Sequence, residues 1–179
     1  MPRIVLIQGS LSPQSKTALV VEETQKALAT MPVECETLDL RSLHLEFCDG
    51  RSLKDYNADM QKAYRVLDAA DGFIFGMPVY CWSFSGVLKN FIDITAGAME
   101  NKAAGILCNA GGPRSFMASS DLIKVLFYES SVIAVHPIVY TSYDDFEDGR
   151  LVGEKALAKI HVMAAALMQQ LPGGREVSV

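Results

Sequence analysis

The stretch "IQGSLSPQSKT", residues Ile7–Thr17, decides how the chain begins to fold. It continues an apolar run, Arg3–Gln8, whose length and content are typical of a strand covered on both faces. The stretch then turns polar and leads into a segment where Val20, Thr24 and Leu28 recur at helical spacing. A strand, a hydroxyl-rich loop and a helix in this order predict the first unit of a parallel α/β sheet.

The same alternation continues along the chain and predicts a parallel sheet with helices on both faces. Four more segments have the apolar content and length of strands: Val33–Leu40, Gly72–Met77, Ala103–Ala110 and Val132–Tyr140. Helical patterns cover Met60–Leu67, Ser85–Ala98, Phe116–Ser130 and Leu157–Leu171. Pro137 is a poor residue for a central strand, so the fifth strand is expected at an edge or ending near His136. We expect one domain over residues 1–172 and a frayed tail over 173–179.

Composition and charge argue against several classes of protein. The net charge is −5 and no three Lys or Arg residues are consecutive, so no nucleic-acid partner is expected. No apolar run approaches the roughly 18 residues that cross a bilayer, and the N-terminus turns polar too soon for a signal peptide. The four cysteines are widely spaced without a C-x-x-C pair, which predicts no metal site and reduced thiols in the cytoplasm.

The first loop fails two tests for known phosphate sites. A nucleoside-triphosphate loop of the form G-x-x-x-x-G-K-[ST] that began at Gly9 would need Gly at position 14 and Lys at 15, where the chain has Gln14 and Ser15. A dinucleotide fingerprint would need glycines at positions 11 and 14, where the chain has Leu11 and Gln14. The loop therefore fits neither a nucleoside triphosphate nor a dinucleotide.

Hydroxyl groups dominate the same loop. Ser10, Ser12, Ser15 and Thr17 fall within eight residues at the start of a helix. Hydroxyls and the free amides of a helix N-terminus can hold a terminal phosphate without a cation. Ser15 alone would be explained as a helix cap, but four hydroxyls exceed what a cap requires. Lys16 could add charge or point into solvent.

The loops after the third and fourth strands complete the expected site, because ligands of such sheets bind beyond the carboxyl ends of the strands. In the first of these loops Pro78 stiffens the chain, and Tyr80 offers a ring near the ligand edge of the sheet. In the second, Gly111 and Gly112 let backbone amides face a ligand. One loop would hold a phosphate and the other two a planar heterocycle.

These segments resemble the flavodoxin-like NAD(P)H-dependent FMN reductase family. "GSLSPQSKT" is similar to its loop G-S-x-[RS]-x-x-S-x-[TN], and "NAGG" to its glycine-rich loop. "PVYCWSFSGVLKNFID" is similar to its segment P-x-Y-x-x-x-x-[SP]-[GA]-x-L-K-N-x-[IL]-D, the most specific of the three. The similarity spans roughly residues 3 to 170. It implies an α/β, flavodoxin-like three-layer sandwich with a five-stranded parallel sheet of order 2-1-3-4-5.

The resemblance also implies non-covalently bound FMN and assigns residues to it by position. The phosphate would be held by Ser10, Ser12, Ser15 and Thr17, with Lys16 beside them. The isoalloxazine would be lined by Pro78, Val79, Tyr80 and Cys81, with Ser83 nearby, and its other edge would meet Asn109, Gly111 and Gly112. Many members carry Arg where this chain has Ser12, so the phosphate would depend more on hydroxyls, amides and Lys16. Members also often carry Asn or Glu around the positions of Val79 and Cys81, so the contacts to the flavin would differ there.

The function implied is hydride transfer from NADPH or NADH to FMN and then to a small-molecule acceptor, by a ping-pong mechanism. A flavin, a quinone, an azo compound or a metal ion would fit as acceptor, and no catalytic side chain is required because FMN carries the chemistry. Arg114 could pair with a nicotinamide phosphate or face solvent. The resemblance further implies a homodimer or homotetramer.

Two alternatives stay open. The chain could be a flavodoxin-type electron carrier that binds FMN without oxidising NAD(P)H. It could also be a non-catalytic signalling or scaffold domain, although a phospho-acceptor receiver would need an acidic pair after the first strand and "QGSLS" offers none.

Overall fold

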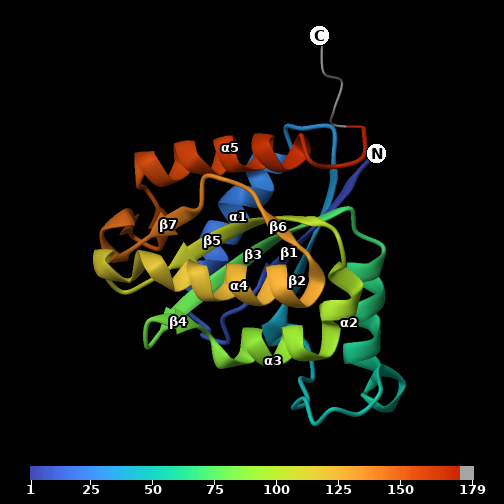
Figure 1. Cartoon of the computed structure of the whole chain (residues 1–179). Coiled ribbons are helices and arrows are strands. Elements are labelled where there is room, and N and C mark those ends of the chain that lie inside the picture. Colours follow the sequence, from blue (N-terminus) through green and yellow to red (C-terminus); the bar gives the residue numbers. More distant parts are fainter. Residues whose placement is uncertain (174–179) are drawn as a thin grey trace.

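The structure, a computed structural model, describes residues 1–173 and is built on a central parallel sheet (Figure 1). The strands are ordered β2-β1-β3-β5, with β6 and β7 both beside β5. Their bounds are β1 Arg3–Gln8, β2 Glu34–Asp39, β3 Gly72–Tyr80, β5 Ala103–Asn109, β6 Ile133–Ala134 and β7 Val139–Thr141. Because β6 and β7 together take the fifth place, the predicted 2-1-3-4-5 order is confirmed and the fold is flavodoxin-like.

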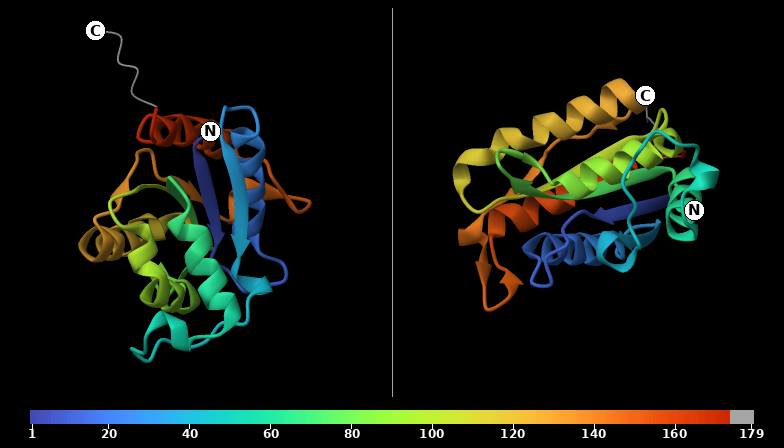
Figure 2. Two further views of the ribbon diagram at one scale, coloured as in Figure 1. Left: turned by 90° about the vertical axis from the view of Figure 1, so that its right-hand side faces the viewer. Right: turned by 90° about the horizontal axis from the view of Figure 1, so that it is seen from below.

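Five α-helices cover the two faces of the sheet, as the views from the side and from below show (Figure 2). They are α1 Lys16–Leu28, α2 Ala58–Asp68, α3 Gly86–Thr95, α4 Ser119–Ser130 and α5 Glu154–Met168. Side chains of α1 and α5 pack with Ile4 and Leu6 of β1, whereas those of α2, α3 and α4 pack with Val5 and Ile7. Alternate residues of a strand point to opposite faces, so a continuously apolar β1 serves both cores.

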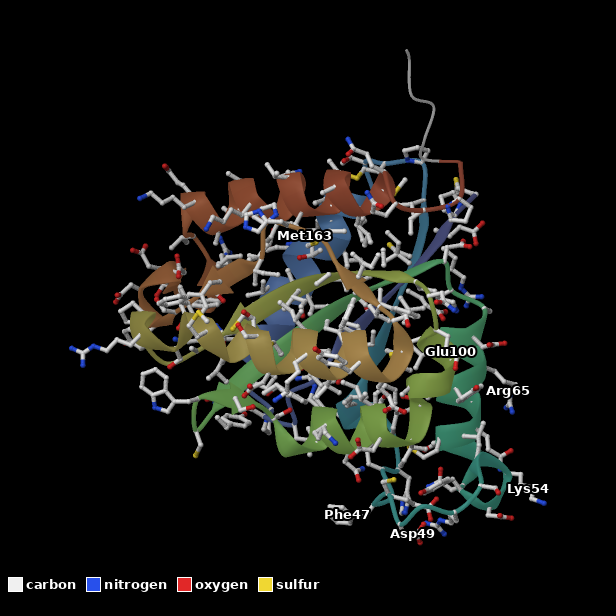
Figure 3. The ribbon with its side chains drawn as sticks, viewed as in Figure 1. Phe47, Asp49, Lys54, Arg65, Glu100 and Met163 are labelled. Carbon is white, nitrogen blue, oxygen red and sulfur yellow. The ribbon has the colours of Figure 1, made fainter. Side chains whose placement is uncertain are left out.

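One helix approaches the sheet at a glycine. Met163 of α5, labelled in Figure 3, packs against β5 where Gly105 has no side chain. A Cβ on Gly105 would lie 2.1 Å from the Met163 sulfur, so a larger residue there would force the methionine aside. This contact helps to hold α5 on the strand that leads into the glycine-rich loop.

The connection between β2 and α2 is long and lies at the end of the molecule that Phe47, Asp49 and Lys54 mark in Figure 3. It contains the 3₁₀ turns η1 Leu40–Ser42 and η2 Leu53–Asp55. Asn90 of α3 anchors it, because its Oδ1 accepts the Cys48 amide and its Nδ2 donates to the Glu46 carbonyl, each at 2.8 Å. The "LKN" part of the second motif therefore supports the fold here.

Several predicted boundaries need correction. The fifth strand, expected over Val132–Tyr140, is interrupted between β6 and β7, where Pro137 provides no amide for the ladder. The third strand extends past Met77 to Tyr80 and turns back through β4 Ser83–Phe84. The last part of the helix predicted over Ser85–Ala98 belongs to a 3₁₀ turn, η3 Ala96–Met99.

Smaller elements lie at the carboxyl edge of the sheet. The segment predicted as a helix from Phe116 opens with a 3₁₀ helix, η4 Pro113–Ala118, before α4 begins. After β7 come the turn η5 Tyr143–Asp145 and a hairpin of β8 Phe146–Glu147 with β9 Arg150–Leu151. Of the tail predicted to be frayed, residues 174–179 lie outside the described part of the chain. Within residues 1–173, no helix is both long and apolar enough to pass through a bilayer.

Candidate functional site

The loop after β1 is fixed to β3 and α3 through its main chain. The Gly9 amide donates to the Gly76 carbonyl at 2.9 Å, and the Ser85 hydroxyl donates to the Gly9 carbonyl at 2.8 Å. A Cβ at Gly9 would lie 2.8 Å from the Gly76 oxygen, so this close approach requires glycine. The side-chain carbonyl of Gln8 also accepts the Ser10 amide at 2.5 Å. The loop is therefore preshaped by contacts that no ligand has to provide.

The four hydroxyl residues of this loop divide into two pairs. Ser10 and Thr17 are buried at 2% and 1% exposure, and the Ser10 hydroxyl accepts the Ser12 amide at 3.3 Å. Ser12 and Ser15 border a cavity, and Ser15 caps α1 by accepting the Ala18 amide at 3.0 Å. The Ala18 amide is thus engaged by the cap, whereas the Lys16 and Thr17 amides before it have no acceptor within the helix and are available to an anion at this end of α1.

Lys16 does not simply extend into solvent. Its ammonium lies 4.1 Å from the ring centroid of Tyr143 and 5.0 Å from that of Phe146, a cation–π arrangement. The turn after β7 thus holds the Lys16 charge beside the first loop.

Asp39 ends β2, next to β1. Burial raises the pKa of Asp39, but hydrogen bonds and charge from Arg41 outweigh the effect of burial and bring that pKa below its usual value.

The three loops predicted from the sequence meet at one cavity of about 200 Å³. The predicted residues that line it are Ser12, Ser15 and Lys16 from the first loop, Pro78, Val79 and Tyr80 from the second, and Asn109 and Gly111 from the third. Tyr80 is 53% exposed, which leaves its ring open to a ligand. A Cβ at Gly111 would meet nothing within 4 Å, so backbone is accessible on that side.

Other predicted residues lie beside this cavity and do not line it. Cys81 and Trp82 form the two-residue turn between β3 and β4, with φ of 49° and 66°, and Ser83 follows them on β4. Gly112 accepts a hydrogen bond from the Tyr140 hydroxyl through its carbonyl. Arg114 is exposed on η4.

Three residues of the lining were not predicted, namely Gln14, Ala110 and Tyr143. Gln14 and Ala110 stand between residues that were, so their loops already indicated them. Tyr143 comes from the polar segment "TSYDDFEDG" after the fifth strand, which carries neither a periodic pattern nor a motif. Only the tertiary fold brings its ring against α1.

Two titratable groups on the strands near the cavity have pKa values raised by burial. No group of three His, Cys, Asp or Glu side chains within residues 1–173 is arranged to hold a metal ion. Burial raises the pKa of the Cys108 thiol in β5 to about 12, so it stays protonated and unreactive. Burial also raises the pKa of Tyr140, whose hydroxyl donates to the glycine-rich loop.

Comparison with known proteins agrees with this geometry. Residues 2–145 match the family described as NADPH-dependent FMN reductase. An NAD(P)H-dependent FAD/FMN reductase of Geobacillus thermodenitrificans is 30% identical over 166 residues, covering 90% of this chain and 89% of that protein. An FMN-dependent NADPH-azoreductase of Staphylococcus aureus is 30% identical over 153 residues, 81% of each chain.

The solved structures show the same architecture. An NADH:FMN oxidoreductase in its apo form has a TM-score of 0.75 and 26% identity, with 99% of this chain and 98% of that chain covered. An oxidoreductase of Corynebacterium diphtheriae has a TM-score of 0.79 at 20% identity, which shows the shared fold. With the match over residues 2–145, these similarities establish that the chain belongs to the NADPH-dependent FMN reductase family.

Proposed function

We propose that the chain binds FMN in the cavity between the three loops and uses it to pass hydride from NAD(P)H to a small-molecule acceptor. The observation that carries this proposal is the convergence of the three loops on one cavity, whose lining includes Ser12, Ser15 and Lys16 of the first loop as well as Tyr80 of the second. Family membership supports the same activity. Bound FMN would supply the redox chemistry, taking hydride from the nicotinamide and passing it on.

The donor set at the first loop fits a terminal phosphate. Ser12 and Ser15 border the cavity, the first amides of α1 point out of the helix end, and the helix dipole favours an anion there. Lys16 adds a positive charge that Tyr143 holds in place. Ser10 and Thr17, both buried, would shape the loop more than contact the ligand, since the Ser10 hydroxyl already accepts the Ser12 amide.

The second and third loops fit a planar ring. Pro78, Val79 and Tyr80 would cover one side, and the backbone of Gly111 would face the other edge, with Gly112 beside it. Asn109 is held by Thr141, whose hydroxyl accepts its side-chain amide at 2.9 Å, so its position is fixed before a ligand arrives. The contribution of these residues is orientation and hydrogen bonding, which is how proteins tune a flavin.

Cys81, Trp82 and Ser83 follow Tyr80 in the hairpin turn and would lie at the rim of the ring site. Arg114 stands just beyond the glycine-rich loop and would meet the phosphates of the nicotinamide cosubstrate. The open side of the ring site would take the nicotinamide and the acceptor in turn, which gives ping-pong kinetics. A homodimer or homotetramer remains part of the proposal, because the exposed aromatics at this rim would suit a neighbouring subunit.

The test is reconstitution of the purified chain with FMN, followed by NADPH and NADH oxidation with a quinone as acceptor. We expect the visible flavin spectrum to stay with the protein after desalting, and steady consumption of NAD(P)H. Binding without steady consumption would favour the electron-carrier alternative. A chain that stays colourless would overturn the proposal and favour a non-catalytic domain. Riboflavin, which lacks the phosphate, is the matched control, and it should bind more weakly than FMN.

A further inference from the structure

A second and larger cavity, of about 590 Å³, lies on the far side of the glycine-rich loop. It is enclosed by η4, the first turn of α4, β7 and the start of α5. Figure 1 shows the starts of α4 and α5 on the same side of the molecule, where the strands end. The loop after β5 lines the first cavity through Gly111 and the second through Phe116. The chain after β7 also lines both cavities, the first through Tyr143 and the second through Asp145.

The walls of the second cavity combine apolar surface with positive charge. Phe116 and Met117 line it and are 57% and 60% exposed, so both side chains offer apolar surface to a ligand. Lys155 and Lys159 face it from successive turns of α5, and no carboxylate among residues 1–173 lies within ion-pair distance of either.

Asp145 is the one carboxylate in this lining, and it is already engaged. Its Oδ2 accepts the Ser142 amide at 2.8 Å and so closes the turn after β7. The cavity is therefore locally cationic in a chain whose net charge is −5. Apolar surface beside two unpaired ammonium groups fits a ligand with a flat apolar part and an anionic group.

A short length of chain joins the two cavities. Gly111 of the first and Phe116 of the second are five positions apart, so their Cα atoms lie no more than about 18 Å from each other even if the chain between them were fully extended. Arg114 is exposed on the short helix η4, between Gly111 of the first cavity and Phe116 of the second. A cation therefore stands on the segment that joins the two cavities.

We propose that the second cavity holds the adenosine end of the reduced nicotinamide cosubstrate, with its 2′-phosphate between Lys155 and Lys159. The adenine would rest on Phe116 and Met117, and Arg114 would meet the pyrophosphate. Because only NADPH carries the 2′-phosphate, the two lysines select NADPH over NADH. This inference rests on the proposed function, since it assumes that the nicotinamide reaches the flavin site.

The test uses the FMN-loaded chain and two fragments, 2′,5′-ADP and 5′-AMP, titrated by calorimetry. We expect 2′,5′-ADP to bind more tightly than 5′-AMP. Lys155→Gln and Lys159→Gln should each weaken 2′,5′-ADP about threefold, and together about tenfold, as for partly exposed ion pairs. The ratio of kcat/KM for NADPH over NADH should fall about tenfold in the double variant, while kcat stays unchanged.

The matched control is Lys124→Gln, which removes a lysine of α4 that faces Asp121 and lies outside the cavity. It should leave both the fragment affinity and the kcat/KM ratio unchanged. The inference is overturned if the double variant keeps the wild-type affinity for 2′,5′-ADP. It is equally overturned if the double substitution lowers the oligomeric state in gel filtration, because the cavity would then be a subunit contact. A chain that binds 2′,5′-ADP through these lysines but takes up no FMN would contradict the proposed function while supporting the nucleotide site.

Discussion

Removing the Ser85 hydroxyl tests whether the first loop is held by the scaffold before a ligand arrives. Ser85 is 2% exposed, and its Oγ makes two hydrogen bonds. It accepts the Leu88 amide at 3.2 Å, which caps α3, and donates to the Gly9 carbonyl at 2.8 Å. Ser85→Ala loses the cap, about 1 kcal/mol, and leaves the buried Gly9 carbonyl without this donor, about 1–2 kcal/mol more.

The expected loss is therefore about 2–3 kcal/mol in the free energy of unfolding, or a fall of about 5–10 °C in Tm for a chain of this size. Thermal and urea unfolding of the ligand-free protein, followed by circular dichroism, measure it. FMN affinity should also fall, and by more than riboflavin affinity, because the loosened loop carries the phosphate donors. The matched control is Ser52→Ala: Ser52 precedes η2 without a side-chain cap hydrogen bond, so its loss should cost little. If Ser85→Ala costs no more than Ser52→Ala, the loop is not held in this way.

Three further predictions follow from other parts of the site. Gly9→Ala should abolish FMN retention, because its Cβ would lie 2.8 Å from the Gly76 oxygen. The control Gly86→Ala should retain FMN, because a Cβ there meets nothing within 4 Å. Equal FMN retention by the two variants would contradict the requirement for glycine at position 9. Between pH 9 and 10 the wild-type chain should lose about 1 kcal/mol of unfolding free energy relative to Cys108→Ala, because the unfolded thiol ionises near 9 while the folded pKa is about 12. Parallel stability curves would refute this. FMN should quench the fluorescence of Trp82, the one tryptophan of the chain, because Trp82 lies two residues after Tyr80 of the cavity lining. Binding of FMN without quenching would place the isoalloxazine ring elsewhere.

The sequence predicted the layers of this fold because its strands are buried on both faces and read as continuous apolar runs. Arg3–Gln8 was predicted at its observed bounds, and the strand ending at Asn109 within one residue. The boundaries that were wrong lie where local rules compete. Pro78 removes an amide donor, yet β3 continues through it in register with Asn109 and ends only at Tyr80. The turn at Cys81 and Trp82 has none of the Gly or Asn residues that usually announce a two-residue hairpin.

The candidate site was predictable to the extent that loops at the carboxyl ends of parallel strands must meet. The sequence alone does not show which of Ser83 and Ser85 in "WSFSG" supports the first loop and which lies near the ligand. The resemblance places Ser83 near the flavin, whereas the structure shows that the neighbouring Ser85 both caps α3 and donates a hydrogen bond to the Gly9 carbonyl. Tyr143 was missed for a related reason, since its role depends on the long connection that brings η5 back to α1.

We infer that the main-chain contacts at Gly9 allow this loop to bind a phosphate, although Ser12 stands where many family members carry arginine. A side-chain arginine supplies charge but has to be ordered, which costs conformational entropy. Here the loop is ordered by the Gly9–Gly76 and Ser85–Gly9 hydrogen bonds, and under the proposed function the charge would come from Lys16, which lies against Tyr143. Ser12→Arg should therefore raise FMN affinity much less in the wild-type chain than in Lys16→Met. Titration of FMN into the four combinations measures this difference. Equal gains in both backgrounds would mean that Lys16 does not substitute for the missing charge.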